Sequence, residues 1–596
     1  MDILGVSCFY HDSAAVLLRD GEIVAASMEE RLTRKKHDSD FPSRAIDFCL
    51  QSGGIRGPDL DYVVFYEKPL VKVGRILQTA LGTFPRSWDF WREAVTAYVS
   101  EKFWIKSLLQ QHLGVRADQI LFCDHHMSHA ASAFFASPFD EAAVLTVDGV
   151  GEWTTTTMGQ ATGHWHNGGE NRIELFWEQR FPHSLGLIYS AFTAFLGFRV
   201  NNGEYKVMGM SPYGEPTQVD KVKKLITLND DGSFYLNMDY FSYHHSATRS
   251  FNGKFLDLFG EPRVHSDDFF TAKSDPSRAG DTETVRRNQY HADIARSIQQ
   301  VTEEALLNMA NALHKRTGAK HLVMAGGVAL NSVANYRMLT ETPFEDVYIQ
   351  PAAGDDGGAL GAALWAYHIV LGQPRKLVMN HTYYGQEFSD DDIRAYLDSS
   401  GIPYKHYKDD NALIDRVVDE ILDQKVIGLF QGRYEWGPRA LGNRSILADP
   451  RRAEMKDIVN TKIKFREPFR PFAPVVLAER AAEYFYYPNV ETASMPRFML
   501  AVSPVKEDKV DVAKATTHAG GTGRLQTIDR ETNPRYYRLV ERFGEATGVP
   551  ILINTSFNLR GEPIVSTPAN AWNTFNNSGI DWLMMGSFLL GKDAKK

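Results

Sequence analysis

Two histidines near position 125 have a spacing that can hold a metal ion. His125 and His129 stand four residues apart, and the run AASAFFAS after them lacks Gly and Pro and suits a helix. Side chains four apart lie on one helical face, so both imidazoles can reach the same ion. A single pair of this kind is more often accidental or on the surface, so a metal site needs further ligands.

Carboxylates at the ends of two predicted strands can supply those ligands. The apolar run 142–147 is typical of a buried strand and leads into Asp148, while the strand within DVYIQPAAG leads to Asp355. Strand ends followed by Gly are where α/β sheets bind ligands. Imidazole nitrogens combined with carboxylate oxygens favour iron or zinc over magnesium or calcium. Asp355 is equally suited to cap the helix that follows it.

Glycine turns between strands and helices predict a place for a phosphate. In HLVMAGGVALNSVAN a buried strand breaks at Gly326 and Gly327 and enters a helix through Asn331. Glycine lets a phosphate or nucleoside approach the backbone, and a helix N-terminus favours an anion. Residues 3–30 read as strand, polar turn and strand, and a similar plan returns from residue 142. Two such units around a nucleotide are the layout of the actin-like ATPase fold.

The C-terminal third carries a local excess of cations. Between Arg433 and Arg470 there are ten Arg and Lys residues but only five Asp and Glu residues. They are interleaved with Gly, Pro and aromatic residues in separate loops, and further polar loops follow in GGTGRLQTIDR and ILINTSFNLRGEP. Rigidly placed Arg side chains suit bidentate capture of phosphate or carboxylate. We expect an oxyanion pocket rather than a nucleic-acid groove.

The length, net charge and cysteine count of the chain exclude several classes of protein. A chain of 596 residues predicts two or three domains. A net charge of −9 argues against a surface that coats nucleic acid, and three scattered cysteines argue against a disulfide framework or a cysteine zinc ribbon. No signal peptide or membrane-spanning run is evident, so a cytoplasmic protein without a membrane partner is expected.

Taken together, these motifs resemble the O-carbamoyltransferase family of NodU, CmcH and TobZ over nearly the whole chain. The densest matches are FYHDSAAVLL, EERLTRKKH, HHMSHAASAF, VDGVGEW, GEYKVMGMSPYG, AGGVALNS, GDDGGALGAA, GRYEWGPRALGNRSILADPR, FREPFRPFAP and INTSFNLRGEP. The resemblance implies an α/β protein in which a TsaD-like actin-type ATPase domain, residues 1–370, carries the metal site. A connecting segment, 371–415, then leads to a YrdC-like twisted α/β domain, 416–596, that binds carbamoyl phosphate and ATP.

The resemblance also implies a reaction. Carbamoyl phosphate and ATP, with Mg²⁺, would give carbamoyl-adenylate, and the carbamoyl group would pass to a hydroxyl of a small-molecule natural product. Fe(II) or another divalent transition metal would serve the transfer. The alternative is a tRNA threonylcarbamoyl-adenosine type of modification enzyme, which would lack the YrdC-like half and favour a basic face. We expect a hydroxylated small-molecule acceptor and no nucleic-acid partner, and a homodimer is left open.

Roles for individual residues follow from the same resemblance. His11 matches the general base, an imidazole that can accept a hydroxyl proton near neutral pH, and Lys36 would neutralise adenylate charge. The metal ligands would be His125, His129, Asp148 and Asp355. The nucleotide would lie against Gly149, Gly151, Gly326, Gly327 and Asn331. Carbamoyl phosphate and the ATP phosphates would be bound by Arg439, Lys464, Arg470, Arg524 and Ser556.

Overall fold

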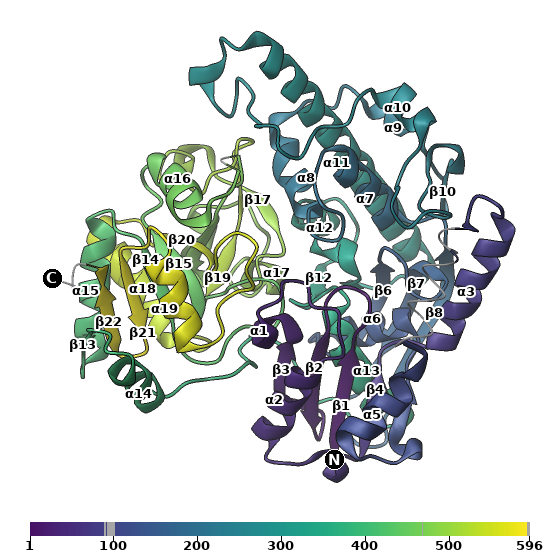
Figure 1. The fold of residues 1–596 in the computed structure, drawn as a ribbon, viewed down its shortest axis with the longest axis horizontal. Helices are drawn as coiled ribbons and strands as arrows, with labels where there is room; N and C mark the ends of the chain where they lie inside the picture. Colours follow the sequence, from purple (N-terminus) through teal and green to yellow (C-terminus); the bar gives the residue numbers. More distant parts are fainter. Residues whose placement is uncertain (89–90, 92–101, 468, 593–596) are drawn as a thin grey trace. The chain divides into compact units, whose positions relative to one another are not determined.

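The computed structural model divides the chain into two compact units. It describes residues 1–88, 91, 102–467 and 469–592. The first unit is Met1–Ala25 with Ser39–Val378, and the second is Ala26–Asp38 with Met379–Lys596. A short segment near the N-terminus therefore belongs with the C-terminal part of the chain (Figure 1). Each unit is described by itself below.

The first unit contains two five-stranded sheets with the same strand order. One sheet has the order β3-β2-β1-β4-β5, and the other has the order β12-β11-β6-β7-β8. In each sheet the first strand along the chain, β1 or β6, pairs antiparallel with the next strand and parallel with the fourth, β4 or β11. The strands are β1 (Asp2–Ser7), β2 (Ala14–Arg19), β3 (Glu22–Met28), β4 (Tyr62–Phe65), β5 (Ile120–Phe122), β6 (Glu141–Val147), β7 (Thr154–Thr162), β8 (Arg172–Arg180), β11 (His321–Ala325) and β12 (Asp346–Ile349). This duplication confirms the predicted repeat and the actin-like fold.

Two helices rich in small residues pack closely beside these sheets. They are α6 (His125–Phe134) and α13 (Asp356–Trp365), and they contact each other as well as the sheets. A Cβ atom placed on Gly361 would lie 1.7 Å from the carbonyl oxygen of Ser128, so only glycine permits this approach. The close packing brings the start of α13 to the histidine face of α6.

We expect Gly361→Ala to separate these helices. The added methyl group meets backbone atoms of α6, which cannot move aside as a flexible side chain would, and overpacking of this kind costs roughly 1–3 kcal/mol. Thermal unfolding should show the loss. Gly74→Ala on α3 (Pro69–Gly82) is the matched control, because a Cβ there meets nothing within 4 Å. Equal melting temperatures for the Gly361 variant and the wild type would contradict the expectation.

A long helix, α11, precedes β11 in the first unit. α11 runs from Thr282 to Thr317 and is followed by Gly318 in the left-handed conformation, with φ of 63°. Asp281 caps its start by accepting a hydrogen bond from the backbone N–H of Thr284. Other helices of this unit are α2 (Ser43–Gly53), α5 (Ile105–Leu113), α7 (Leu185–Phe195), α8 (Glu204–Met210), α9 (Val219–Val222), α10 (Gly253–Phe259) and α12 (Ser332–Thr340).

The second unit is built on an eight-stranded mixed sheet, in agreement with the expected α/β class of this domain. Its strand order is β13-β22-β21-β14-β15-β20-β16-β19. The strands are β13 (Lys405–His406), β14 (Ile427–Phe430), β15 (Arg444–Ala448), β16 (Ala473–Leu477), β19 (Gln526–Ile528), β20 (Ile551–Ser556), β21 (Trp582–Met585) and β22 (Phe588–Gly591). A short separate ribbon pairs β17 (Val502–Pro504) with β18 (Thr522–Arg524).

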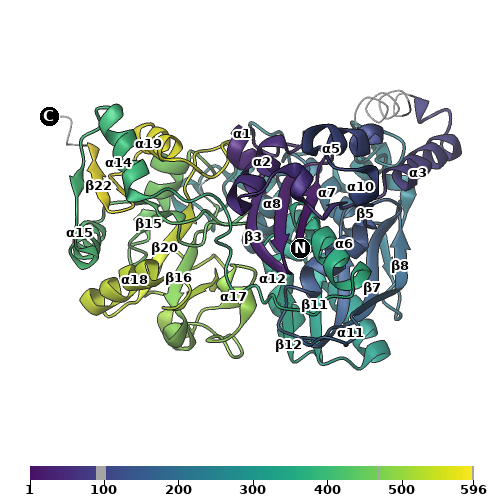
Figure 2. The ribbon, with the colours of Figure 1, turned by 90° about the horizontal axis from the view of Figure 1, so that it is seen from below.

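Helices cover both faces of this eight-stranded sheet. Ile446 of β15 packs with α14 (Asp390–Ser399) and α19 (Pro568–Asn576), whereas its neighbour Leu447 packs with α15 (Asp410–Leu422) and α18 (Pro534–Thr547). Successive side chains of a strand point to opposite faces, so the sheet carries two apolar layers. Figure 2 shows the two helix pairs on either side of the strands.

The segment Ala26–Asp38 is fastened to the second unit by buried hydrogen bonds. It contains α1 (Glu29–Thr33). Arg31 donates to the carbonyl oxygen of Gly437 at 2.8 Å, and Ser566 donates to the carbonyl oxygen of Arg31 at 2.6 Å. Throughout the part of the chain that the structure describes, no helix combines the length and the apolar character needed to span a bilayer.

Candidate metal centre and anion site

Four buried side chains of the first unit converge on one point. His125 and His129 lie one turn apart on α6, Asp148 follows β6, and Asp355 directly precedes α13. The Nε2 atoms of the histidines are 3.1 Å apart, and His125 Nε2 lies 3.2 Å from Asp148 Oδ2. His129 Nε2 lies 3.5 Å from Asp355 Oδ1. None of the four residues is more than 4% exposed.

This arrangement fits a metal ion. One ligand atom from each residue lies within 4.8 Å of all the others. A tetrahedral ion with bonds of about 2.1 Å places its ligands about 3.4 Å apart, close to the distances observed. Both oxygens of Asp355 are buried without a hydrogen-bond partner among the described residues, which is costly for a carboxylate unless a cation binds it. Two nitrogens and two oxygens suit iron or zinc.

The charges in the cluster shift the protonation of its members. Burial alone lowers the pKa of His125, but Asp355 and Asp148 outweigh it and raise the pKa to about 9. Burial raises the pKa of Asp148, yet the hydrogen bond from His125 and the charge of His129 bring it well below its usual value. A divalent cation would compete with protons for these imidazoles, so metal binding should release protons.

His11 lies beside this cluster with its ring oriented by Asp12. His11 Nδ1 is 2.8 Å from Asp12 Oδ2, and His11 Nε2 is 4.0 Å from Asp355 Oδ2. Burial lowers the pKa of His11, but Asp12, Asp355 and Asp148 raise it to about 10. A cation bound by Asp148 and Asp355 would offset the negative charges that raise this pKa. With Asp12 accepting the Nδ1 proton, the neutral ring would then present the lone pair of Nε2, as a general base requires.

The predicted nucleotide residues of the first unit gather around Asp148. Gly327 N–H donates to Asp148 Oδ1 at 2.9 Å, and a Cβ on Gly326 would lie 2.3 Å from the carbonyl oxygen of Val147. A Cβ on Gly151 would meet the ring of His125 at 2.6 Å, whereas a Cβ on Gly149 would make only ordinary contacts, at 3.9 Å, with Leu187 and the hydroxyl of Tyr10. These glycines therefore lie next to the residues of the metal cluster.

Asn331 stands at the beginning of α12, where its side chain is already hydrogen-bonded. Its Oδ1 accepts from the backbone N–H of Ala334 at 3.2 Å and from Gln299 Nε2 at 3.0 Å. The amide therefore caps the helix and links it to α11. Its role toward a nucleotide stays a prediction.

In the second unit, Lys464 and Ser556 come into direct contact. Lys464 Nζ donates to Ser556 Oγ at 3.3 Å and to Asn558 Oδ1 at 2.8 Å. Burial and the charges of Arg466 and Arg470 lower the pKa of Lys464 well below its usual value. The cluster therefore concentrates positive charge in a buried place, which favours an incoming anion.

Lys36 belongs to the same unit, although it lies far from Lys464 in sequence. It is carried by the segment Ala26–Asp38 and pairs with Glu30 at 2.9 Å. Its positive charge is among those that lower the pKa of Lys464, after burial and the arginines. The structure thus adds Lys36 to the cationic cluster.

The structure places Arg439 beside β20 and Arg524 at the end of β18. Arg439 precedes Ala440, whose carbonyl oxygen accepts from Asn554 Nδ2 of β20 at 3.1 Å. Arg524 ends β18, and burial together with Arg524 and Lys456 lowers the pKa of His518 to about 3. Their contacts with a phosphate stay predictions.

Comparison with known proteins identifies the family. The carbamoyltransferase N-terminus model matches residues 2–364, and the carbamoyltransferase C-terminus model matches residues 418–592. The chain belongs to the carbamoyltransferase family. As in the predicted resemblance, both halves of the family are present in one chain.

Three curated relatives show the range of this carbamoyltransferase family. An uncharacterized protein of Synechocystis sp. is 45% identical over 100% of this chain and 97% of its own length. Nodulation protein NolNO of Sinorhizobium fredii is 37% identical over 98% of this chain and 79% of its own length. The 3'-hydroxymethylcephem-O-carbamoyltransferase of Amycolatopsis lactamdurans is 33% identical over 44% of this chain and 48% of its own length.

Three carboxylates that the sequence analysis did not single out hold predicted site residues, or the loops that carry them, in one or the other unit. Asp12 orients His11, and Glu152 accepts from the backbone N–H groups of His125 and Lys68. Glu435 accepts from the backbone of Leu441, Asn443 and Arg444 and so shapes the loop that holds Arg439. Each of these residues lies inside one of the sequence motifs quoted above, and this position was the feature of the sequence that could have identified it.

We expect Glu152→Ala to weaken metal binding. Glu152 is 7% exposed and lies 3.2 Å from the N–H of His125, where a carboxylate steadies the start of α6. Loss of such a supporting residue typically costs 10–100-fold in metal affinity. Competition with a chelator measures the change, and Glu141→Gln at an exposed position of β6 is the control. Unchanged affinity in Glu152→Ala would show that α6 needs no such support.

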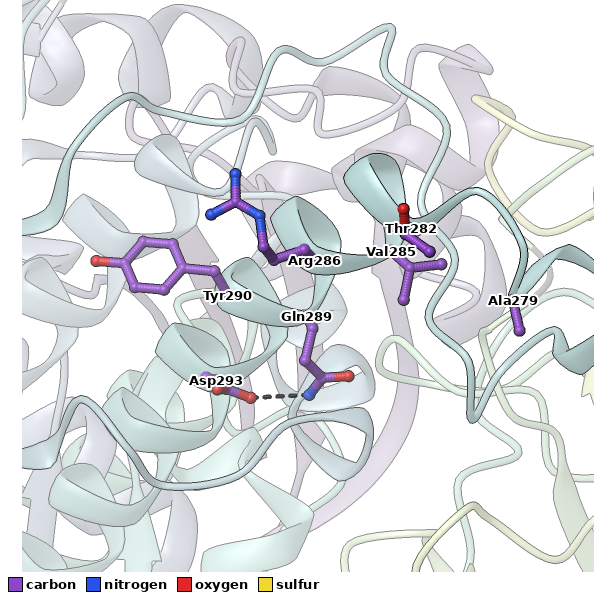
Figure 3. Close-up of a pocket in the computed structure, with 7 residues that line it drawn as sticks. All are labelled: Ala279, Thr282, Val285, Arg286, Gln289, Tyr290 and Asp293. Atoms are coloured by element: carbon purple, nitrogen blue, oxygen red, sulfur yellow. Dashed lines mark hydrogen bonds between the residues drawn. The ribbon is translucent and has the colours of Figure 1, made fainter.

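A groove of 440 Å³ lies along the N-terminal half of α11, apart from the residues described above (Figure 3). Gln289 donates to Asp293 across its floor at 2.8 Å, and Asp293 also accepts from Thr217. The lining residues are Ala279, Thr282, Val285, Arg286, Gln289, Tyr290 and Asp293. None of the predicted site residues is among them.

Proposed function

We propose that this carbamoyltransferase makes carbamoyl-adenylate from carbamoyl phosphate and ATP and transfers the carbamoyl group to a hydroxyl of a small molecule. The observation that carries the proposal is that one chain contains two groups of side chains with different chemistry. The first unit holds the buried His–Asp cluster with His11 beside it, and the second holds the cationic cluster. The cationic cluster suits the activation of carbamoyl phosphate, and the His–Asp cluster with His11 suits the attack by a hydroxyl.

The second unit would carry out the activation. Arg439, Arg470 and Arg524 would pair with phosphate oxygens of carbamoyl phosphate and of ATP with Mg²⁺, because a guanidinium can donate two parallel hydrogen bonds to such groups. Lys464 and Ser556 would hold a phosphate between them, and Lys36 would balance charge on the adenylate. Phosphate and pyrophosphate would leave as the adenylate forms.

The first unit would carry out the transfer. His11 would take the proton of the acceptor hydroxyl at Nε2 while Asp12 holds the ring. The hydroxyl oxygen would then bond to the carbamoyl carbon, and AMP would leave. A divalent metal held by His125, His129, Asp148 and Asp355, Fe(II) by family resemblance, would supply Lewis-acid polarisation. Gly149 would leave room for the phosphate of the adenylate, and Gly151 lets the ring of His125 lie close to the loop.

Incubation with ATP, carbamoyl phosphate and a panel of hydroxylated metabolites tests the proposal. The expected result is AMP formation together with a carbamoyl mass gain on at least one small-molecule acceptor, read by mass spectrometry. Omission of carbamoyl phosphate is the control. A protein that modifies only tRNA in the same assay, or forms no AMP with any acceptor, would overturn the proposed function.

A further inference from the structure

Helix α3 carries two buried cations that the proposed function does not use. Lys72 is 3% exposed and pairs with Glu67 at 2.6 Å, and Arg75 is 9% exposed and donates to the carbonyl oxygen of Gly151 at 3.1 Å. A buried ion pair is a poor source of stability, because removing two charges from water costs about as much as their attraction returns. Arg75 therefore brings a positive charge to the loop 148–151, and Lys72 brings a second one close to the ring of Tyr10.

Tyr10 lies between these cations and the catalytic side of the site. Its ring centroid is 4.7 Å from that of His11, and Lys72 Nζ lies 5.1 Å from the centre of the Tyr10 ring. The hydroxyl lies 3.9 Å from the position that a Cβ of Gly149 would occupy. Tyr10 therefore reaches from the general base to the glycine turn that is proposed to face the adenylate phosphate.

The hydroxyl of Tyr10 is available as a hydrogen-bond donor. It makes no hydrogen bond within residues 1–88, 91, 102–467 and 469–592. Burial and the charges of Asp148 and Asp355 raise the pKa of Tyr10 far above neutrality. The group therefore keeps its proton, and a phenol without an internal partner can donate that proton to a ligand.

We propose that Tyr10 is a further catalytic residue, whose hydroxyl donates a hydrogen bond to the phosphate of the departing AMP. The inference rests on the proposed function. When the acceptor oxygen bonds to the carbamoyl carbon, the bond from that carbon to the phosphate oxygen breaks, and its electron pair stays on AMP. The acceptor proton goes to His11. Tyr10 stabilises the charge that develops on the phosphate, and Lys72 and Arg75 provide the positive surroundings.

Tyr10→Phe tests this role by removing one oxygen atom. Loss of one donor to a developing charge typically costs about 100-fold or more in kcat, so transfer should fall by about that factor while the KM for the acceptor stays the same. Affinity for AMP should fall about tenfold, whereas affinity for adenosine, which lacks the phosphate, should not change. Metal content and pyrophosphate release should equal those of the wild type.

Tyr243→Phe is the matched control, because it removes the hydroxyl of another half-buried tyrosine of the first unit, one that donates to the carbonyl oxygen of Pro182. Wild-type transfer rates in Tyr10→Phe would overturn the inference. So would a loss of metal, or equal losses of AMP and adenosine binding, since either result would give Tyr10 a structural role. Absence of any transfer by the wild-type protein would instead refute the proposed function.

Discussion

His129→Ala should abolish carbamoyl transfer and remove the bound metal. The side chain is fully buried, and its Nε2 atom lies 3.1 Å from His125 Nε2 and 3.5 Å from Asp355 Oδ1. Without His129, three of the four ligands remain. The negative charges of Asp148 and Asp355 are then balanced by one imidazole instead of two. We expect metal affinity to fall by more than the roughly 100-fold typical of a lost supporting residue. Elemental analysis of the purified protein measures the metal directly.

A control separates loss of metal from loss of fold. His166→Ala removes an exposed histidine of the same unit and should leave metal content and transfer unchanged. The melting temperature of His129→Ala should match that of wild-type protein stripped of metal by a chelator, because both lack the same ion. Full activity of wild-type protein in excess chelator, with no stoichiometric transition metal bound, would refute the metal hypothesis.

Arg470→Ala and His11→Ala should lose different halves of the reaction. Arg470 belongs to the cationic cluster around Lys464, so its loss should abolish the pyrophosphate release that depends on carbamoyl phosphate. His11 lies at the metal cluster of the first unit, so its loss should leave pyrophosphate release intact and abolish transfer to the acceptor. Loss of a general base typically costs 10²–10⁴-fold.

Both half-reactions can be followed in one sample. Pyrophosphate is measured by a coupled assay, and the carbamoylated acceptor is measured by mass spectrometry. Arg452→Ala, an exposed arginine of the second unit, is the control and should keep both activities. Equal loss of pyrophosphate release in the His11 and Arg470 variants would show that activation and transfer do not occupy separate sites.

The sequence by itself determined the local geometry of the metal centre. A spacing of four residues without Gly or Pro places His125 and His129 on one helical face, and an apolar run ending in Asp148 is a buried strand with a carboxylate at its end. These features depend on neighbouring residues and on periodicity, which the chain carries with it. The repeated strand pattern likewise indicated the duplicated sheets before their order was known.

The tertiary structure decided which distant residues meet. Asp355 suited a helix cap as well as a metal ligand, and in the structure it makes no side-chain cap bond to α13. Helices α6 and α13 approach closely at Gly361, and the carboxylate of Asp355 lies 3.5 Å from His129 Nε2. Lys36 precedes the metal residues in the chain, yet it belongs to the second unit, because Arg31 is bound there by Gly437 and Ser566. Such contacts depend on the packing of whole helices and sheets, which spacing along the chain does not encode.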